Sequence, residues 1–435
     1  CVISSTRDSA FGGTGINGEP DYWGGLFVES GALFSGSNLD VIFGLDNQTR
    51  ALINLKGDIS FDQSRIHSTA LYMYGIFVDL SGITQTKWDD LGNVYHDILS
   101  GNNSNTVAVG GVLSQNLCIQ SNLYSYAITQ KIFIPTSISL SFESVGLIVS
   151  NSNGGVEVDG TLNISGTESN RTTITSMYDV SVGGSGVSST DHFWNGVFVK
   201  ANALLNLSFA DLKYATEMQP ASSESYSLLI EGNATINQLK LEHSGFVLCR
   251  FNGNTIKISD SELLNNSDLS FVNQSLGIRL YSVGEGGQFI FANNNVISNG
   301  IFLYLDANSS VADSFDCTIA NNSVTSNHFM HGNFAGALNF SGNEMNALTS
   351  NAFTAVYLFG GNESIVIYNN TFIDYSAPIG LFNIKEIEEV NISSNRIQNV
   401  AFQGARIEGD YIRRLIFEYN EVRGVQGERS GSGAY

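Results

Sequence analysis

Short segments of one shared hydrophobic pattern recur along the C-terminal half of the chain. In each segment two apolar residues alternate with any residue, two residues follow, and an Asn then stands two positions before another apolar residue. This alternation has a period of two, which is typical of a β-strand, and no helical period of 3.6 is sustained. β-Branched and aromatic residues dominate, which also favours strands. Six copies are FIFANNNV (Phe289, Phe291, Asn294, Val296), CTIANNSV (Cys317, Ile319, Asn322, Val324), LNFSGNEM (Leu338, Phe340, Asn343, Met345), IVIYNNTF (Ile365, Ile367, Asn370, Phe372), VNISSNRI (Val390, Ile392, Asn395, Ile397) and LIFEYNEV (Leu415, Phe417, Asn420, Val422).

The asparagines of these segments define the repeat, with spacings of 28, 21, 27, 25 and 25 residues. A period in the twenties predicts one coil of a β-solenoid, in which like side chains stack across a strand spacing of ~4.8 Å. We expect a ladder of turn asparagines, because Asn tolerates left-handed backbone and its amide can bond to the Asn one coil away. The same stacking predicts that Cys317 points inward between Phe289 and Leu338, as a buried thiol.

A second kind of repeat links the two halves of the chain. Residues 6–33 recur at 177–204 without a gap, so that Asp8 aligns with Asp179 and Trp23 with Trp194. Each copy marks the same early coil, and we therefore expect two β-helix units in tandem. Because both Trp residues recur at a structural position, we expect them to pack where a loop rejoins the helix rather than to serve as sugar platforms.

The stretch around the second copy resembles a known group. Residues 156–167 read VEVDGTLNISGT, residues 174–176 read ITS, a Gly-Gly pair stands at 183–184, and residues 194–197 read WNGV. This succession is similar to the first coils of right-handed parallel β-helix proteins of the pectate-lyase-like superfamily, in particular large secreted or surface proteins. The resemblance covers nearly the whole chain and implies an all-β fold, a right-handed parallel β-helix, which agrees with the general preference for right-handed crossovers. It implies little about function, because the fold carries lyases, hydrolases, esterases, adhesins and spikes.

The repeats also predict the domain organisation. We expect the C-terminal part of a first β-helix unit at 1–116 and a second unit at 117–435, with opening coils at 117–215 and Asn-marked coils at 216–425. The first unit begins directly at a strand, Val2-Ile3-Ser4, without opening coils. We therefore expect the chain to be a segment of a longer polypeptide. An uncapped solenoid end is a template for another strand, so the expected partners are neighbouring β-helix units or copies of the chain end to end.

Charge and cysteine content narrow the class of protein. Lys and Arg total 20 against 41 Asp and Glu, a net charge of −21, which disfavours nucleic acid and anionic lipid surfaces. No run of 18 apolar residues occurs, so no membrane insertion is expected, and no signal peptide opens the chain, which fits a mature or excised segment. The cysteines are too few and scattered for a disulfide scaffold or a zinc site, and lipidation of the first one is an alternative that the repeat disfavours. They are Cys1, Cys118, Cys249 and Cys317, and the disulfide state of the first three stays open.

Sequons for N-glycosylation are abundant, which predicts an extracellular or cell-surface glycoprotein. The alternative is that Asn serves turns. The candidates are Asn47, Asn102, Asn163, Asn170, Asn206, Asn233, Asn265, Asn273, Asn308, Asn321, Asn339, Asn362, Asn369 and Asn391.

A catalytic β-helix needs outward carboxylates at one lateral position of neighbouring coils, as a glycoside hydrolase does. The sequence has no such acidic ladder. Glu418 and Glu421 flank the last ladder Asn, for example, whereas the preceding coil has Ser393 and Arg396 at those positions. We therefore assign no catalytic residue and no cofactor.

Two features carry metal hypotheses. In each copy of the repeated loop an Asp, Asp8 or Asp179, stands four residues before a Gly-Gly pair. A carboxylate with backbone carbonyls of such a loop can hold Ca²⁺, although a structural Asp that caps loop amides explains the repetition equally well. The pair His328-x-x-His331 can likewise bind a metal or serve as polar loop residues.

The leading hypothesis is a non-enzymatic structural component of an extracellular surface assembly, a fibre, sheath or adhesin stalk. One alternative is a carbohydrate-binding module, which a line of exposed aromatics such as Tyr72, Tyr74, Tyr281 and Tyr304 would favour. The other is a polysaccharide lyase or glycoside hydrolase of the pectate-lyase-like superfamily.

Overall fold

The computed structural model describes residues 2–3, 23–37, 39–42, 51–62, 65–67, 74–89, 106–120, 125–187, 192–218, 225–265, 277–284, 286–306, 315–334, 336–349, 352, 354–360, 363–385, 387–400 and 403–424. The contacts divide the chain into two compact units, Cys1–Val197 and Phe198–Tyr435. Each unit is a nearly all-β stack of mainly parallel strands, a β-solenoid, as the period of the sequence predicts.

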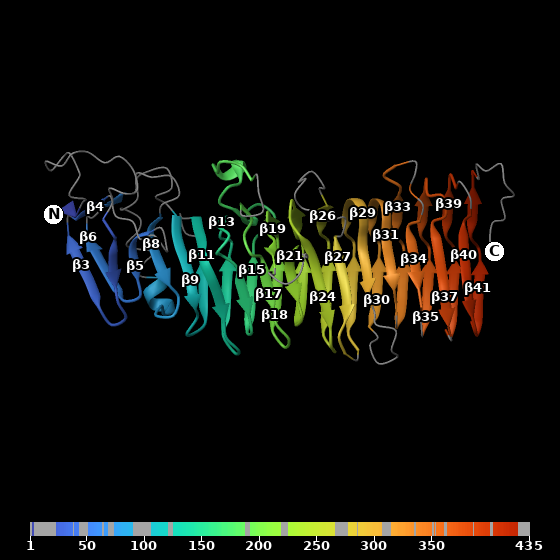
Figure 1. Ribbon diagram of the computed structural model, residues 1–435, viewed down its shortest axis with the longest axis horizontal. Helices are drawn as coiled ribbons and strands as arrows, with labels where there is room; N and C mark the ends of the chain where they lie inside the picture. The colour runs from blue at the N-terminus through green and yellow to red at the C-terminus, as the bar shows by residue number, and fades with distance from the viewer. Residues whose placement is uncertain are drawn as a thin grey trace. The chain divides into compact units, whose positions relative to one another are not determined.

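The second unit has three rows of strands, which run side by side in Figure 1 from green to red. Row 1 consists of β18 (Leu204–Ser208), β22 (Asn233–Asn237), β25 (Thr255–Ser259), β28 (Gln288–Ala292), β30 (Asp316–Ala320), β32 (Ala337–Ser341), β35 (Ser364–Tyr368), β38 (Glu389–Ser393) and β41 (Arg414–Glu418). Row 2 consists of β19 (Ala210–Lys213), β23 (Lys240–Glu242), β26 (Glu262–Asn265), the first parts of β29 (Asn295–Asp306) and β31 (Ser323–Asn333), β33 (Glu344–Asn346), β36 (Thr371–Ile373), β39 (Arg396–Gln398) and β42 (Glu421–Arg423). Row 3 consists of β21 (Ser225–Ile230), β24 (Phe246–Phe251), β27 (Ile278–Ser282), the second parts of β29 and β31, β34 (Val356–Phe359), β37 (Ile379–Lys385) and β40 (Ala405–Asp410), and the short β20 (Glu217–Met218) pairs antiparallel with β21.

Inward side chains of row 1 form columns, because the strands pair in register. Phe289 pairs with Cys317 and Cys317 with Leu338, so the predicted inward position of this thiol is confirmed. Cys317 is buried, and its pKa is raised, first because burial disfavours the thiolate and then because Asp316 is near. Phenylalanines continue the core from coil to coil, with ring centroids 6.0 Å apart for Phe329 and Phe340.

The turn between rows 1 and 2 has a left-handed residue, but this residue is not the ladder Asn. Positive φ falls on the residue just before it, for example 58° at Asn293, 56° at Asn321 and 57° at Tyr419. The expectation that the ladder Asn itself takes the left-handed conformation is therefore wrong. The preceding residue absorbs the sharp bend, and the ladder Asn is left free to point its amide inward.

The first unit contains two successive sets of rows. Its N-terminal set comprises a pairing of β1 (Val2–Ile3), β4 (Asp40–Ile42) and β7 (Arg65–His67), a pairing of β3 (Leu33–Ser37) and β6 (Asp58–Asp62), and a pairing of β2 (Leu26–Val28), β5 (Ala51–Leu55) and β8 (Tyr74–Asp79). Its later set has β10 (Leu117–Gln120), β12 (Ser139–Glu143) and β15 (Thr161–Ser165) in row 1. The other rows hold β9 (Thr106–Val112), β11 (Ser125–Ile134), β13 (Leu147–Ser150), β14 (Val156–Val158) and β16 (Thr172–Ser176). The short helix η3 (Val180–Val182) follows, and β17 (Val197–Val199) lies at the unit boundary.

Among the described strands, the two sets are joined by the pairing of β8 with β9. β8 pairs with β9, and β9 pairs with both parts of β11, the first of which continues into β13 and β16 and the second into β14. In the N-terminal set, the row of β2, β5 and β8 comes just before the row of β3 and β6 along the chain. Through β9 this row meets the row of β13 and β16, which comes just after row 1 in the later set. A short helix at residues 85–89 lies in the connection between β8 and β9. The change of rows falls close to residue 116, where the sequence predicts a boundary, whereas the contact-defined units meet at Val197 and Phe198.

Candidate functional site

The outer face of row 3 carries a column of aromatic and basic side chains in the second unit. Register places Arg279, Tyr304, His331, Tyr357 and Gly380 directly opposite one another on successive strands. Arg406 on β40 is the next residue of this column. We call these six residues the row 3 column. From β27 to β40 it spans five strand steps, about 24 Å at ~4.8 Å per step.

The rings of the column stack on one another. Ring centroids are 5.9 Å apart for Tyr304 and His331 and 5.1 Å apart for His331 and Tyr357, with interplanar angles of 21° and 6°. The three side chains are partly buried. Stacked rings occupy one another's faces, so the column presents ring edges and polar atoms to solvent.

Gly380 interrupts the column without breaking the stack. A Cβ at this position would lie 2.7 Å from the Phe382 ring and 3.1 Å from Tyr357. The missing side chain leaves room for the ring of Phe382, two residues further along β37, to lie against Tyr357 at a centroid distance of 4.8 Å. Phe359 also contacts Tyr357 edge-on at 4.9 Å.

Arginines cap both ends of the stack. The Arg279 guanidinium lies 5.7 Å from the Tyr304 ring centroid, and its Nη2 is 2.7 Å from Oδ2 of Asp306. At the other end the Arg406 guanidinium lies 5.1 Å from the Phe382 ring centroid, and its Nε donates to Oε1 of Glu408 at 2.6 Å. Cation–π contacts and ion pairs of this kind hold the guanidinium groups over the rings.

A second outward column runs beside the first one. It contains Arg250, Tyr281, Asp306, Asn333 and Phe359 on successive strands. Tyr281 and Tyr304 therefore lie on neighbouring coils of row 3 but in adjacent columns, and both are partly buried, so these two residues do not form the exposed line that the carbohydrate hypothesis describes. Tyr72 and the side chain of Tyr74 lie outside the described residues.

The two histidines of this region have lowered pKa values. Burial is the first cause for both His328 and His331, and the nearby His328 lowers the pKa of His331 further. Both belong to β31, so the expected loop position is wrong: the strand continues through them. Within the described parts of the chain, no group of three His, Cys, Asp or Glu side chains is arranged to hold a metal ion.

The predicted turn ladder joins row 1 to row 2 inside the coil. Nδ2 of each ladder Asn donates to Oδ1 of the next, at 3.0 Å for Asn294 to Asn322, 2.8 Å for Asn322 to Asn343 and 2.9 Å for Asn343 to Asn370. The same amides donate to backbone carbonyls of the preceding coil, and the ladder continues through Asn395 to Asn420 at 3.0 Å per step. The predicted amide bonds between coils are confirmed.

Asp179 caps its own loop. Its buried carboxylate accepts from the Ser181 backbone N–H at 2.8 Å and from the Thr175 hydroxyl at 2.7 Å, at the start of η3. These bonds account for an Asp at this place in the loop. Asp8 lies outside the described residues, and calcium binding at the two loops stays a prediction. Trp194 is fully buried, in agreement with the expected packing role.

Eight sequon asparagines have described side chains, and all belong to row 1 strands or to the turns beside them. Asn170, Asn233, Asn321, Asn339 and Asn369 are exposed, whereas Asn163, Asn206 and Asn391 are partly buried. Glycosylation of each stays a prediction. Asn47, Asn102, Asn273, Asn308, Asn362 and the side chain of Asn265 lie outside the described residues.

The described cysteines are free thiols. Burial raises the pKa of Cys118 to about 11, helped by a hydrogen bond and the charge of Glu143. Cys249 is fully buried, and burial raises its pKa strongly. Cys1 lies outside the described residues. No helix of the described chain has the length and apolar character required to cross a membrane.

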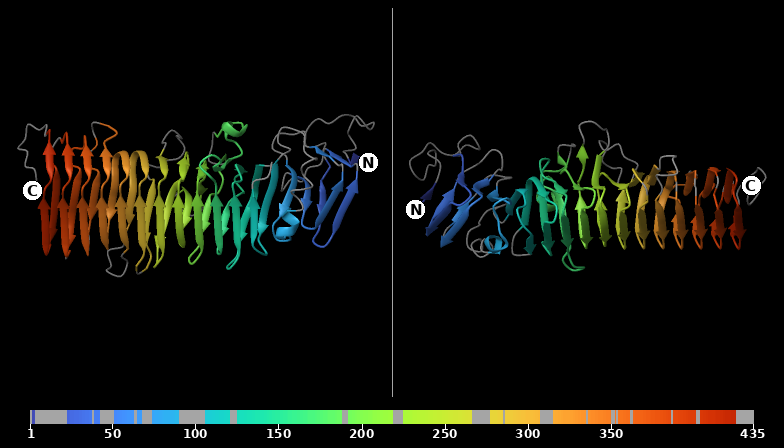
Figure 2. Two further views of the ribbon diagram at one scale, coloured as in Figure 1. Left: turned by 180° about the vertical axis from the view of Figure 1, so that it is seen from behind. Right: turned by 90° about the horizontal axis from the view of Figure 1, so that it is seen from below.

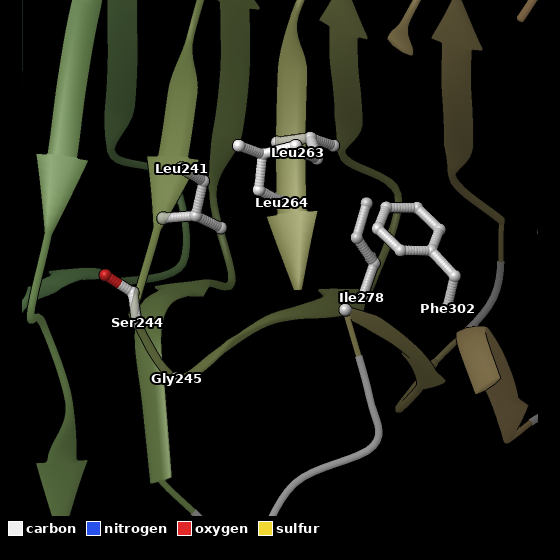
Figure 3. A pocket seen from close by; sticks show the side chains of 8 residues that line it. Leu241, Ser244, Gly245, Leu263, Leu264, Ile278 and Phe302 are labelled. Carbon is white, nitrogen blue, oxygen red and sulfur yellow. The ribbon is translucent and has the colours of Figure 1, made fainter. Parts of the chain in front are cut away.

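One small recess opens where rows 2 and 3 meet, and Figure 3 shows its lining. Leucine side chains, Ile278 and Phe302 surround it, and the only hydroxyl of the lining is that of Ser244. This hydroxyl donates to the Glu242 carbonyl at 2.9 Å and accepts from the Ala215 N–H at 3.2 Å. The described lining is therefore apolar and has no titratable group.

Sequence reasoning missed the row 3 column. A sequence pattern that could have indicated it exists, because strands of row 3 have an inward residue between two outward ones, as in Arg279-Leu280-Tyr281 and Tyr357-Leu358-Phe359. These triplets have no Asn marker, and the loops before them vary in length. Comparison of the chain with protein-family models, with curated proteins and with solved structures gave no match. The fold defines the class, a parallel β-solenoid.

Proposed function

We propose that the chain is a non-enzymatic structural element of an extracellular surface assembly, such as a fibre, a sheath or an adhesin stalk. The observation that carries this proposal is the bonding of each coil of the second unit to the next. Inside, the ladder asparagines and the phenylalanine columns repeat from coil to coil. Outside, Lys213 lies 3.0 Å from Glu242 and Lys240 lies 3.1 Å from Glu262, each pair across neighbouring strands.

These bonds differ in strength. An exposed ion pair contributes about 0–1 kcal/mol, whereas leaving one buried amide partner unsatisfied costs about 1–3 kcal/mol. Among the side-chain bonds between coils, the buried ladder therefore contributes more than the surface ion pairs, and it adds to the backbone hydrogen bonds of the paired strands. A solenoid whose neighbouring coils are all bonded in this way resists bending and local opening, which suits a stalk or fibre.

The extracellular location has its own support. Exposed sequon asparagines such as Asn321, Asn339 and Asn369 lie on the outer face of row 1 or in its turns, where solvent reaches them. The resemblance of the opening coils to secreted and surface proteins of the pectate-lyase-like superfamily points in the same direction. A net charge of −21 keeps such a protein soluble.

Electron microscopy of the native material, with intact-mass analysis beside it, tests this proposal. We expect regular filaments or sheets and mass added at sequons. Incubation with a panel of acidic and neutral polysaccharides is expected to release no oligosaccharide above the protein-free control. Unassembled particles of bare peptide mass that release oligosaccharide over many turnovers would overturn the proposal.

Carbohydrate binding is a second candidate function, favoured by the aromatic and polar side chains of row 3. Their stripe is long and narrow, about 24 Å by two side chains. A standard protein partner covers about 800 Å² on each side, which is more than such a stripe offers, whereas an extended sugar chain fits its shape. Hydrogen-bonding groups along it include the hydroxyls of Tyr304 and Tyr357, the Asp306 carboxylate and the Asn333 amide.

Glycan-array and calorimetric binding measurements test this candidate on matched variants. Tyr357→Ala removes the centre of the row 3 column, and Tyr368→Ala removes a Tyr that is 48% exposed on row 1. We expect binding to fall at least tenfold in the first variant and to stay unchanged in the second. Equal affinity of both variants, or no binding by the wild type, would exclude row 3 as a sugar site.

A further inference from the structure

Two sheet edges face the short helix of the first unit. Among the described strands, β6 pairs only with β3, and β10 pairs on one side only, with β12. Each strand thus has one edge that no described strand covers. Residues 80–89, with the helix at 85–89, lie between these strands, as both views of Figure 2 show in light blue.

The side chain of Gln85 occupies the edge of β10 as a neighbouring strand would. Its Oε1 accepts from the Cys118 backbone N–H at 2.7 Å, and its Nε2 donates to the Cys118 carbonyl at 2.9 Å. In a β-strand the N–H and C=O of one residue point to the same edge. One carboxamide therefore satisfies both groups that an added strand would use at this residue. The remaining Nε2 hydrogen goes to Oδ1 of Asp89 at 2.9 Å, which fixes the orientation of the amide.

Three other contacts hold the helix in this place. Gln115 donates from Nε2 to the Ile83 carbonyl at 3.2 Å, on the side of β10. On the opposite side, Nζ of Lys87 lies 2.8 Å from Oδ1 of Asp58, the first residue of β6. Trp88 is buried, with its ring centroid 5.8 Å from that of Tyr126 on β11. The helix is therefore tied to both strands and to the row that joins the two sets.

We propose that residues 80–89 are an edge cap that prevents strand addition to β10 and β6. An uncovered strand edge is a template for pairing with another chain, and natural proteins cover such edges with helices or loops. The strand that the cap excludes is a parallel strand of a second copy of this chain. Leu117 and Ile119 of β10 point inward, and other row 1 strands, such as β12, have the same alternation. A second copy therefore offers strands that match the edge.

The test uses the full chain and the double variant Gln85→Ala/Trp88→Ala. Hydrogen exchange at the Cys118 amide, followed by mass spectrometry, is expected to accelerate at least tenfold. Sedimentation velocity is expected to show concentration-dependent association. Lys131→Ala, which removes an exposed ion pair with Glu157 in the same unit, is the matched control and is expected to stay like the wild type.

Two additional variants test the proposal if the double variant does not fold and show whether association uses the edge of β10. Gln85→Glu retains an acceptor for the Cys118 N–H but loses the donor to its carbonyl, and it is expected to associate even if the double variant does not fold. Adding Gln120→Pro removes a backbone N–H from the free edge of β10 and is expected to abolish association, because proline blocks strand addition. Faster exchange at Cys118 without association, or association that Gln120→Pro leaves unchanged, would overturn the proposal.

Discussion

Replacing Asn343, at the middle of the turn ladder, tests how much the buried amides stabilise the contact between coils. It is 1% exposed, and its side chain serves two coils. Oδ1 accepts from the backbone N–H of Asn322 at 3.0 Å and from its Nδ2 at 2.8 Å. Nδ2 donates to the Ile319 carbonyl at 3.0 Å and to Oδ1 of Asn370 at 2.9 Å.

In Asn343→Ala, some hydrogen-bonding partners of the lost side chain keep another bond and others do not. Asn370 Oδ1 keeps a bond from the Asn343 backbone N–H, and Asn322 Nδ2 keeps a bond to the Phe291 carbonyl. The Asn322 N–H and the second hydrogen of its amide lose their acceptor in a buried site. At about 1–3 kcal/mol for each unsatisfied group, the local free energy of opening falls by about 2–6 kcal/mol. This corresponds to a roughly 30-fold to 10⁴-fold faster exchange of the Asn322 amide.

Native-state hydrogen exchange is the suitable assay, because repeat arrays need not unfold in one step and a single global free energy is then undefined. Asn346→Ala is the control, since the side chain of this partly exposed Asn donates to Glu344 of its own strand at 3.5 Å, and its bond from the Tyr375 hydroxyl goes to the backbone carbonyl, which Ala retains. We expect the control to change the opening free energy by less than about 0.5 kcal/mol. Equal exchange rates at Asn322 in the two variants would refute the idea that the buried ladder adds to the cohesion between coils.

Three other predictions concern groups at fixed places in the fold. Gly380→Ala is expected to destabilise the second unit by about 1–3 kcal/mol and to change the near-UV circular dichroism, because its Cβ would displace the Phe382 ring; an unchanged spectrum and melting temperature would contradict the packing. His331 has a pKa below that of the unfolded chain, so its contribution to stability is complete above about pH 6.5 and decreases as the pH falls below that value, and a His331→Gln variant should show a weaker loss in acid melting curves; an identical pH profile would argue against this. Alkylation of Cys118 should be slow at pH 8 and rise steeply towards pH 11, and Cys249 should react only on unfolding; peptide mapping of labelled protein that finds both modified at pH 8 in the native state would contradict their burial.

Much of rows 1 and 2 was predictable from the sequence because an Asn stands at a constant distance from the apolar residues on either side of it. A tight turn of invariant length joins these two rows, so the register of one strand determines that of the next. The inward position of Cys317 followed from this register alone. The identity of the residue with left-handed backbone did not follow, since Asn at two successive positions suits either conformation.

Row 3 could not be placed in the same way. The loops that enter and leave it differ in length from coil to coil, so sequence spacing does not show which Tyr, His or Arg shares a column. Tyr304, His331 and Tyr357 come together because their strands pair in register, and Phe382 reaches Tyr357 only because Gly380 has no side chain. These are properties of packing between coils.

The sequence by itself determined the solenoid, its period, its parallel strands and its buried Asn ladder, because each depends on local alternation repeated at short range. Tertiary structure alone decided the outer columns and the edge cap. Gln85 and Cys118 are 33 residues apart, and nothing in their local sequence indicates that a side-chain amide will meet a strand edge. Contacts of this kind depend on where long connections return, and that is set by the packing of the whole unit.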